Sequence, residues 1–177
     1  MAHVISSINI TLSGSCHHTD AVADEEHHQY ALNLLASSSA LLLGRITFEL
    51  FESFWPEAVT RRDLPSYMSS FAAELDAKPK YVLSSRGLCT QWRNTTLLQG
   101  PELEEANRLI REVPGVIVVF GSPRLAASLA AAGLVHELHV VVQPFIPDPG
   151  ERFMHSVQGS PEHRRFPCLP ACTFARI

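Results

Sequence analysis

Arginine and hydroxyl side chains follow short apolar segments at three places in the chain. Each place also offers small residues at which the backbone can turn sharply. The three segments are Gly44–Arg45–Ile46–Thr47, Ser84–Ser85–Arg86 and Gly121–Ser122–Pro123–Arg124. Guanidinium groups pair with phosphate as planar forks, and a glycine lets the backbone of a following helix approach an anion. The pattern predicts a site for a ligand with several phosphates, and a dinucleotide is the obvious candidate.

Each segment also has a purely structural interpretation. Thr47 can be a helix N-cap, Gly44 a tight turn, and Gly121 an ordinary end to a strand. The presence of all three segments in one fold favours the binding interpretation. The chain contains neither Gly-x-Gly-x-x-Gly nor Gly-x-x-x-x-Gly-Lys-Ser/Thr. A dinucleotide site here is therefore not of the Rossmann type.

Strands and helices alternate along the predicted secondary structure, and these elements must position the three turns. Strands are predicted for six β-branched or apolar runs: His3–Thr11, Ala40–Leu43, Lys80–Ser84, Thr95–Gln99, Val116–Phe120 and Glu137–Gln143. Helices are predicted over Ala23–Ser38 and Thr47–Phe54 (ending before Pro56), within Leu64–Lys78, after Gly100–Pro101, and over Pro123–Ala132. Short spacing between the elements predicts a three-layer αβα fold with a mainly parallel central sheet. Ligands of such sheets bind at the carboxyl ends of the strands.

Composition favours one soluble globular domain. The chain has 177 residues, of which 46% are hydrophobic and 18% are charged, and its formal net charge is −4. Such a chain buries enough surface for a stable core, and it lacks the like-charge blocks that mark nucleic-acid or membrane contacts. We find no membrane-spanning run and no signal-peptide pattern. We expect a single cytoplasmic domain over residues 1–177, with an atypical segment at about 151–177 in which Ala171–Ala175 is a candidate last strand.

Several segments resemble one protein family. Leu-Leu-Leu-Gly-Arg-Ile-Thr-Phe-Glu at Leu41–Glu49, followed by Phe54–Trp55–Pro56, resembles the dihydrofolate-reductase-like superfamily. The closest branch is the one with the reductase domain of the riboflavin-biosynthesis bifunctional deaminase–reductase. The resemblance runs from about residue 3 to residue 154. It includes four further segments: Ile8–Gly14, Val82–Ser85, Val118–Leu125 and Ala131–Leu138.

This resemblance implies an NADPH-dependent reductase, often a homodimer. Hydride would pass to a C=O or C=N group of a pyrimidine, pterin or related small molecule, as in 5-amino-6-(5-phosphoribosylamino)uracil reductase or dihydrofolate reductase. The positions that would bind the cofactor are Gly44, Arg45, Thr47, Ser84, Ser85, Arg86, Gly121, Ser122, Arg124 and Leu125. The substrate side would include Ser13 and Gly14, with His17 in the same loop.

Reduction also requires a proton, which a side chain or water must supply. The candidate side chains are Glu26 and His28 on the first predicted helix. Three positions depart from the family pattern. Ser13 stands where Asp is usual, His136 stands where an acid is usual, and Ser122 replaces the second glycine of a Gly-Gly turn. We expect Ser122 to strain a backbone geometry suited to glycine.

Two other functions are open at this point. Zinc ligands are offered by Cys16–His17–His18, His27–His28, His163, Cys168 and Cys172, but their spacings match no familiar pattern. His136 and His139 are expected on opposite faces of a strand, so no metal is expected. The alternative to an enzyme is a nucleotide- or ligand-binding protein of the same fold without turnover, because the carboxylate usual at position 13 is missing.

Overall fold

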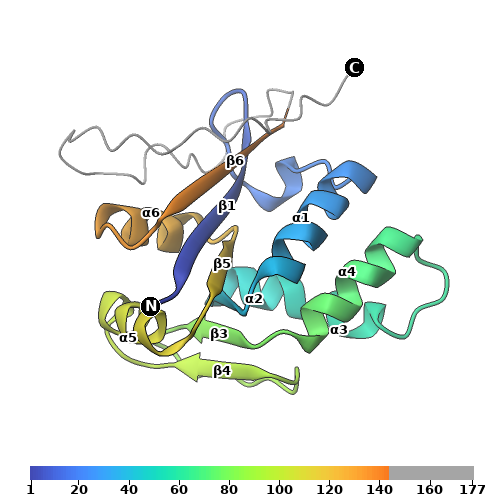
Figure 1. The fold of residues 1–177 in the computed structure, drawn as a ribbon. Coiled ribbons are helices and arrows are strands. Elements are labelled where there is room, and N and C mark those ends of the chain that lie inside the picture. Colours follow the sequence, from blue (N-terminus) through green and yellow to red (C-terminus); the bar gives the residue numbers. More distant parts are fainter. Residues whose placement is uncertain (144–177) are drawn as a thin grey trace.

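The apolar runs assemble into a sheet of six strands that all pair in parallel (Figure 1). The structure is a computed structural model, and it describes residues 1–143. The strands are β1 His3–Thr11, β2 Ala40–Gly44, β3 Lys80–Leu83, β4 Thr95–Leu98, β5 Val116–Phe120 and β6 Glu137–Gln143, in the order β4-β3-β2-β5-β1-β6. The expected strand Ala171–Ala175 and the segment 151–177 lie outside the described residues.

Helices cover both faces of the sheet, which confirms the predicted three-layer αβα fold. They are α1 Glu25–Ser37, α2 Arg45–Glu52, α3 Trp55–Ala58, α4 Ser66–Ala77, α5 Glu102–Glu112 and α6 Pro123–Ala131, with a 3-10 turn at His18–Asp20. Helices α5 and α6 lie on one face, and α1 to α4 lie on the other (Figure 1). The described sheet is thus entirely parallel, with the helices as crossovers between strands.

The expected helix over Thr47–Phe54 is corrected at both ends. Helix α2 begins two residues earlier, at Arg45, and ends at Glu52. Pro56 does not terminate it, because Pro56 lies in the first turn of the separate short helix α3. A proline is tolerated there because the first turn of a helix makes no use of its backbone N–H.

Side chains of each central strand alternate between two apolar cores. On β1, Val4 packs towards α5 and α6, whereas Ile5 packs towards α1 and α4. On β5, Val119 and Val118 divide in the same way. The residues Ala40–Leu43 of β2 are all at most 1% exposed. A continuous apolar run is what a parallel strand with both faces covered requires.

Lys80 is a fully buried cation at the start of β3. Its ammonium donates hydrogen bonds to the carbonyl oxygens of Leu75, Asp76 and Lys78 at 3.0, 3.2 and 2.9 Å. It also lies 4.5 Å from the centre of the Trp92 ring. Burial lowers the pKa of Lys80 from 10.5 to about 8. The interaction caps the carboxyl end of α4, where helix carbonyls lack partners of their own.

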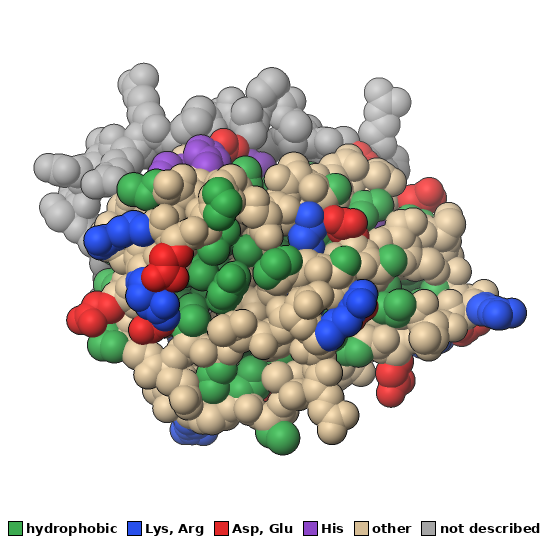
Figure 2. Space-filling model, turned by 60° about the horizontal axis from the view of Figure 1, so that its bottom comes forward, with side chains coloured by type: hydrophobic (Ala, Val, Ile, Leu, Met, Phe, Trp, Pro, Cys, Tyr) green, Lys and Arg blue, Asp and Glu red, His purple; other side chains and the backbone are tan. Residues whose placement is uncertain are grey.

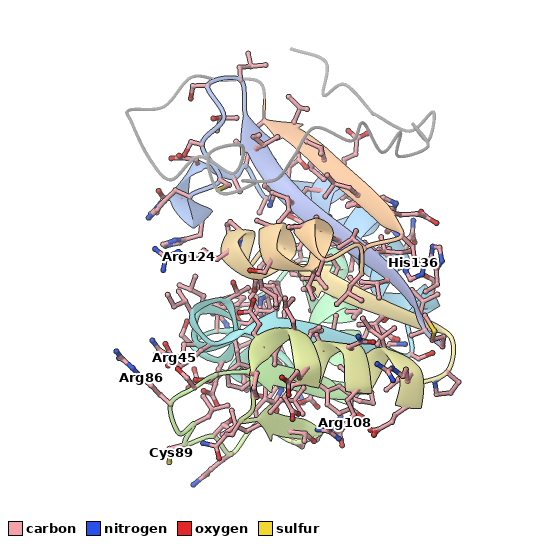
Figure 3. All side chains as sticks on the ribbon, turned by 90° about the vertical axis from the view of Figure 1, so that its left-hand side faces the viewer. Arg45, Arg86, Cys89, Arg108, Arg124 and His136 are labelled. Atoms are coloured by element: carbon pink, nitrogen blue, oxygen red, sulfur yellow. The ribbon has the colours of Figure 1, made fainter. Side chains whose placement is uncertain are left out.

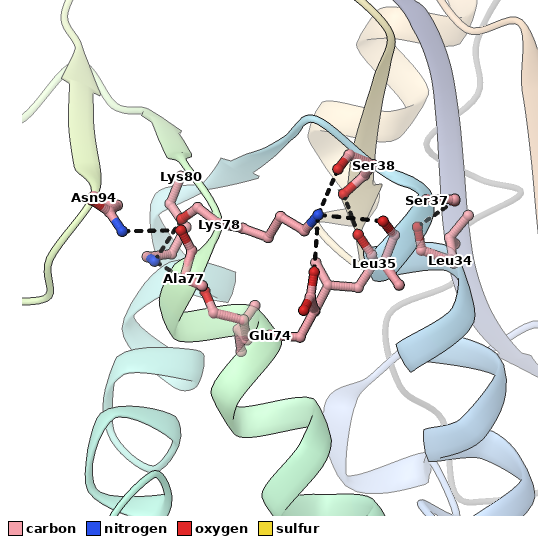
Figure 4. A network of polar contacts seen from close by, with 11 residues as sticks. Leu34, Leu35, Ser37, Ser38, Glu74, Ala77, Lys78, Lys80 and Asn94 are labelled. Atoms are coloured by element: carbon pink, nitrogen blue, oxygen red, sulfur yellow. Dashed lines mark hydrogen bonds and ion pairs between the residues drawn. The ribbon is translucent and has the colours of Figure 1, made fainter.

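Lys78 joins the ends of two helices beside this buried cation (Figure 4). Its ammonium donates to the carbonyl oxygen of Ser38, after α1, at 2.7 Å, and it pairs with Glu74 of α4 at 3.0 Å. The two lysines therefore fix α1 and α4 relative to the start of β3. The three predicted turns lie at the opposite, carboxyl ends of β2, β3 and β5.

Charges on the surface are mixed in sign. Figure 2 shows acidic and basic side chains interspersed over one face. On α5, for example, Arg108 forms ion pairs with both Glu105 and Glu112. Among residues 1–143, no helix combines the length and the apolar character needed to cross a membrane.

Candidate functional site

A cleft of about 580 Å³ opens at the carboxyl ends of β2, β3, β4 and β5. The turns that follow these four strands line it, so the three segments predicted from sequence meet at one edge of the sheet. Arg45, Arg86 and Arg124 extend along this side of the molecule, and His136 lies at the opposite side (Figure 3). This location agrees with the general rule for ligand sites of parallel sheets.

Two of the turns are joined directly by hydrogen bonds. The backbone N–H of Gly44 donates to the Ser122 hydroxyl at 2.9 Å, and the N–H of Ser122 donates to the Thr47 hydroxyl at 3.1 Å. A Cβ atom at position 44 would lie 3.3 Å from the Ser122 hydroxyl oxygen. Glycine at position 44 therefore lets the two turns approach closely, because a larger residue would push the Ser122 side chain away by a few tenths of an ångström.

Ser122 occupies the left-handed region of backbone conformation, with φ 49° and ψ 61°. Gly121 before it also has a positive φ, of 54°. A Cβ atom in this region is strained, and the geometry suits a Gly-Gly turn, as the sequence comparison with the family pattern predicted. Both hydrogen bonds of Ser122 hold it in this strained conformation.

Three helices begin at the cleft without a side-chain cap. These are α2, α5 and α6, whose N-cap residues are Gly44, Pro101 and Ser122. In α6 the first N–H to bond within the helix is that of Ala126, to the carbonyl of Ser122 at 2.9 Å. The earlier N–H groups of a helix have no helical acceptor, and the helix dipole makes this end attractive to anions. The first turn of α5 carries Glu102, Glu104 and Glu105, whose charges oppose an anion there, so the ends of α2 and α6 are the two that suit a ligand with more than one phosphate.

Basic and hydroxyl side chains complete the lining. Arg45 is half-buried and pairs with Glu49 at 2.6 Å, which directs the guanidinium along α2. The N–H of Arg86 donates to the Ser84 hydroxyl at 3.1 Å, and this bond shapes the turn after β3. Hydroxyls and an exposed arginine are groups that bind a phosphate monoester.

The sequence model of the RibD C-terminal domain family matches residues 2–154 of this chain. The chain belongs to this family. A crystal structure from Shewanella sp. PV-4, of a protein assigned to riboflavin biosynthesis, is similar in fold: its TM-score is 0.58 at 17% identity, over 85% of this chain and 82% of that one. No curated protein sequence matches the chain. The RibD family and the fold confirm the resemblance to the riboflavin-biosynthesis reductase branch of the dihydrofolate-reductase-like superfamily.

Nine of the ten positions carried over from the RibD-like reductases line the cleft. The tenth, Gly121, is one residue from the lining, and a Cβ atom on it would lie 3.5 Å from the Thr47 methyl group. The lining also contains Ile46, Leu83 and Pro123, which lie within the segments predicted from sequence, and it contains Gly100, Pro101 and Glu102, which sequence reasoning missed. The turn at Gly100–Pro101 carries neither arginine nor hydroxyl, so the pattern used for the other three turns does not find it; its only signal is its place between a predicted strand and a predicted helix.

The loop after β1 holds the three positions predicted for the substrate side. The Ser13 and Thr11 hydroxyl oxygens are 3.1 Å apart, and Gly14 adopts a φ of 84°. Nδ1 of His17 accepts a hydrogen bond from Thr19 within the loop. The loop follows β1, which is the neighbour of β5, and it does not belong to the lining of the cleft. Its contact with a substrate stays a prediction.

The two candidate proton donors on α1 have different surroundings. Glu26 is exposed. His28 is buried, and its Nδ1–H donates to the carbonyl of Asp24 at 2.8 Å. Its ring also lies 5.2 Å from the ring of Tyr67 and 6.0 Å from that of Phe71. These contacts make His28 part of the packing between α1 and α4, and neither residue lines the cleft. A catalytic role for either one stays a prediction.

Histidines and cysteines do not gather into a metal centre in the part of the chain that is described. Within residues 1–143, no three His, Cys, Asp or Glu side chains are placed to hold one ion. His163, Cys168 and Cys172 lie outside these residues. His136 precedes β6 and is not part of the strand; its Nδ1 accepts the N–H of Val4 at 3.0 Å. The expectation that His136 and His139 lie on opposite faces of one strand therefore does not apply as stated.

Proposed function

We propose that this protein is an NADPH-dependent reductase that transfers hydride to a C=O or C=N group of a pyrimidine, a pterin or a related small molecule. The observation that carries the proposal is the cleft, in which three arginines and the uncapped N-termini of α2 and α6 face one space. These groups fit the phosphates of a dinucleotide. Membership of the RibD C-terminal domain family supports a reductase of this kind.

Each part of the cleft has a role in this proposal. The N-termini of α2 and α6, with Arg45 and Arg124, hold the pyrophosphate. Ser84, Ser85 and Arg86 hold the 2′-phosphate, which is the group that distinguishes NADPH from NADH. When bound, the cofactor supplies the hydride, and the protein supplies its position relative to the substrate.

Titration of the purified protein with NADPH and NADH, followed by nicotinamide fluorescence or heat, tests the proposal. NADPH should bind more tightly than NADH. Arg45→Ala should weaken the binding of both cofactors at least about 10-fold, because a charge-assisted hydrogen bond contributes roughly 1.5–3 kcal/mol. Ser85→Ala and Arg86→Ala should weaken NADPH selectively. Arg111→Ala, an exposed arginine on α5 outside the cleft, is the matched control.

Two outcomes of this titration would contradict the proposal. If neither cofactor binds, the proposed reductase function is refuted. If NADPH and NADH bind with equal affinity, and Arg86→Ala does not change it, the proposed role of the turn after β3 is refuted.

A nucleotide-binding protein without turnover is the second candidate function. It is favoured by Ser13, which is bonded within its own loop and provides no carboxylate. NADPH binding without NADPH oxidation in the presence of 7,8-dihydrofolate or 5-amino-6-(5-phosphoribosylamino)uracil would support it. We also infer, from the family, a cytoplasmic homodimer, which light scattering coupled to size-exclusion chromatography tests.

A further inference from the structure

A strip of polar side chains crosses the face of β1 and β6 that α1 covers. In the register of these strands Ser7 pairs with His139 and Ile5 pairs with Glu137. Because side chains alternate along a strand, Ser7, His139 and Glu137 project on the same side of the sheet. The remainder of this face is an apolar core. Polar residues in such a place need an explanation beyond packing.

The side chains of this strip form one continuous chain of hydrogen bonds. The Ser7 hydroxyl lies 3.1 Å from the Tyr30 hydroxyl, which comes from α1. The Tyr30 hydroxyl lies 2.8 Å from Nδ1 of His139. Nε2 of His139 lies 3.1 Å from one oxygen of Glu137, and Nε2 of His3 lies 2.7 Å from the other oxygen. We call Ser7, Tyr30, His139, Glu137 and His3 the relay.

The chemistry of the groups fixes the direction of these bonds. A carboxylate only accepts, so Nε2–H of His139 donates to Glu137. In a neutral imidazole the other nitrogen must then accept, and Tyr30 donates to it. When His139 carries a second proton, Nδ1–H donates to Tyr30 instead. The Tyr30 proton is then free to bond to another acceptor.

The relay runs from exposed to enclosed surroundings. The side chains of His3, Glu137 and His139 are 44%, 27% and 19% exposed, and Ser7 is 6% exposed. His3 is at the N-terminal end of β1, whereas the cleft lies at the carboxyl ends of the strands, so the relay starts at the opposite end of the sheet. The relay thus joins solvent-exposed side chains to Tyr30, and His139 is its only member that bonds to Tyr30 from the exposed side.

The enclosed end of the relay adjoins the cleft turn. Ser7 pairs with Phe120, the last residue of β5. The carbonyl of Ser7 also accepts the N–H of Gly121 at 3.0 Å. Gly121 directly precedes Ser122, which lines the cleft. The Tyr30 hydroxyl, bonded to Ser7, therefore lies beside the strand end that leads into the glycine turn, on the α1 side of the sheet, and Tyr30 itself is not among the residues that line the cleft.

Two pKa shifts bear on the relay. Burial raises the pKa of Tyr30, which makes the phenol a weaker acid, so it can give up its proton only as its partner supplies another. The hydrogen bond from His139, followed by that from His3, lowers the pKa of Glu137, which favours its charged carboxylate. His136, whose ring centre is 4.8 Å from that of His3, is the further titratable group at this end of the relay. Figure 2 shows histidines gathered at one border of the surface.

We propose that Tyr30 donates the proton that completes reduction, and that His139, positioned by Glu137, replaces it. This inference rests on the proposed reductase function. As hydride reaches the carbon of the C=O or C=N group, the electron pair of the double bond moves to the heteroatom. The heteroatom takes the Tyr30 proton, Tyr30 takes the Nδ1 proton of His139, and imidazolium becomes imidazole. Nδ1 of His139, which gave up that proton, takes one proton from solvent, and this restores the starting state.

The test uses full-length Tyr30→Phe and His139→Gln, with NADPH oxidation measured against 7,8-dihydrofolate and 5-amino-6-(5-phosphoribosylamino)uracil. Tyr30→Phe should lower kcat at least about 100-fold, the usual contribution of general acid catalysis, with NADPH affinity unchanged. His139→Gln keeps neutral hydrogen bonds but carries no extra proton. It should abolish the fall of kcat with rising pH and reduce the solvent deuterium isotope effect. Tyr81→Phe, a half-buried tyrosine of β3 packed in the opposite core, is the control.

The outcomes separate the relay from the reductase function. A Tyr30→Phe variant with unchanged kcat, pH profile and isotope effect would overturn the relay and leave the reductase standing. NADPH binding by the unaltered protein without oxidation in the presence of either probe would refute turnover, and the relay with it. Nitrogen-15 spectra provide a check on fold and tautomer. In the unaltered protein they should show Nε2 of His139 protonated at neutral pH. In Tyr30→Phe the His139 signals should move, and in Tyr81→Phe they should not.

Discussion

The two substitutions Ser122→Ala and Ser122→Gly separate the two energetic terms at the junction of the glycine turns. Both remove the hydroxyl that accepts the Gly44 N–H at 2.9 Å. Ser122 is only 6% exposed, so solvent replaces this acceptor poorly. The loss of a partner for a buried donor costs roughly 1–3 kcal/mol. Alanine retains the Cβ atom in the left-handed region, at φ 49°, whereas glycine does not.

The difference between the two variants measures the backbone strain. A Cβ atom in the left-handed region costs roughly 1–2 kcal/mol. The greater freedom of glycine in the unfolded chain offsets part of the gain, by roughly 0.5–1 kcal/mol. We therefore expect Ser122→Ala to lower the free energy of unfolding by about 2 kcal/mol, and Ser122→Gly to lower it by about 1 kcal/mol less than that.

Urea unfolding, followed by the fluorescence of Trp55 and Trp92, provides the assay. With a urea m-value of about 2 kcal/mol/M, the alanine variant should unfold at a midpoint about 1 M lower than the unaltered protein. The glycine variant should fall between them. Ser70→Ala, in an exposed position of α4, is the control for removal of a hydroxyl. An alanine variant as stable as the glycine variant would refute the strain, and an unchanged midpoint in both would refute the hydrogen bond.

Two further predictions concern the elements behind the cleft. Burial lowers the pKa of Lys80 from 10.5 to about 8, so between these pH values the unfolded chain binds more protons than the folded one. The free energy of unfolding should thus rise with pH in that window, by up to about 3 kcal/mol, and urea unfolding at several pH values should show no such rise in Lys80→Met. Asp24→Ala removes the N-cap bond to the N–H of His27 at 2.9 Å, and should cost about 1 kcal/mol, or a Tm about 2–4 °C lower by circular dichroism. Asp24→Asn should retain most of the stability, and equal melting of the two variants would contradict the cap.

Secondary structure was predictable wherever local chemistry determines it. The run Ala40–Leu43 reads as a doubly covered strand because all of its side chains are apolar. The helix predicted over Ala23–Ser38 begins at Glu25, and Asp24, expected in its first turn, is the N-cap; the acidic residues indicated this start because carboxylates bond to the first free N–H groups and favour the dipole. Pro56 was misinterpreted because a proline both ends a helix and begins one, and the local sequence does not distinguish the two roles.

The residue types that line most of the cleft were predictable from the sequence, but the fourth turn that contributes to its lining was not. Its arginines, serines and glycines follow strands, and the carboxyl ends of parallel strands share one edge. Gly100–Pro101 was taken only as the start of a helix. The relay was not predictable, because Tyr30 and His139 are 109 positions apart in sequence and only the parallel pairing of β1 with β6 brings them together.

By itself, the sequence determined the alternation of strands and helices and the chemistry of each turn, since both depend on neighbours a few residues away. The tertiary structure alone decided which turns touch. Ser122 reads in sequence as a departure from Gly-Gly, yet in space its hydroxyl holds Gly44 and its N–H is held by Thr47. His28 reads as a candidate acid, yet it is packed among aromatic rings. These outcomes depend on strand order and register, which arise from burial of the whole sheet and not from any local pattern.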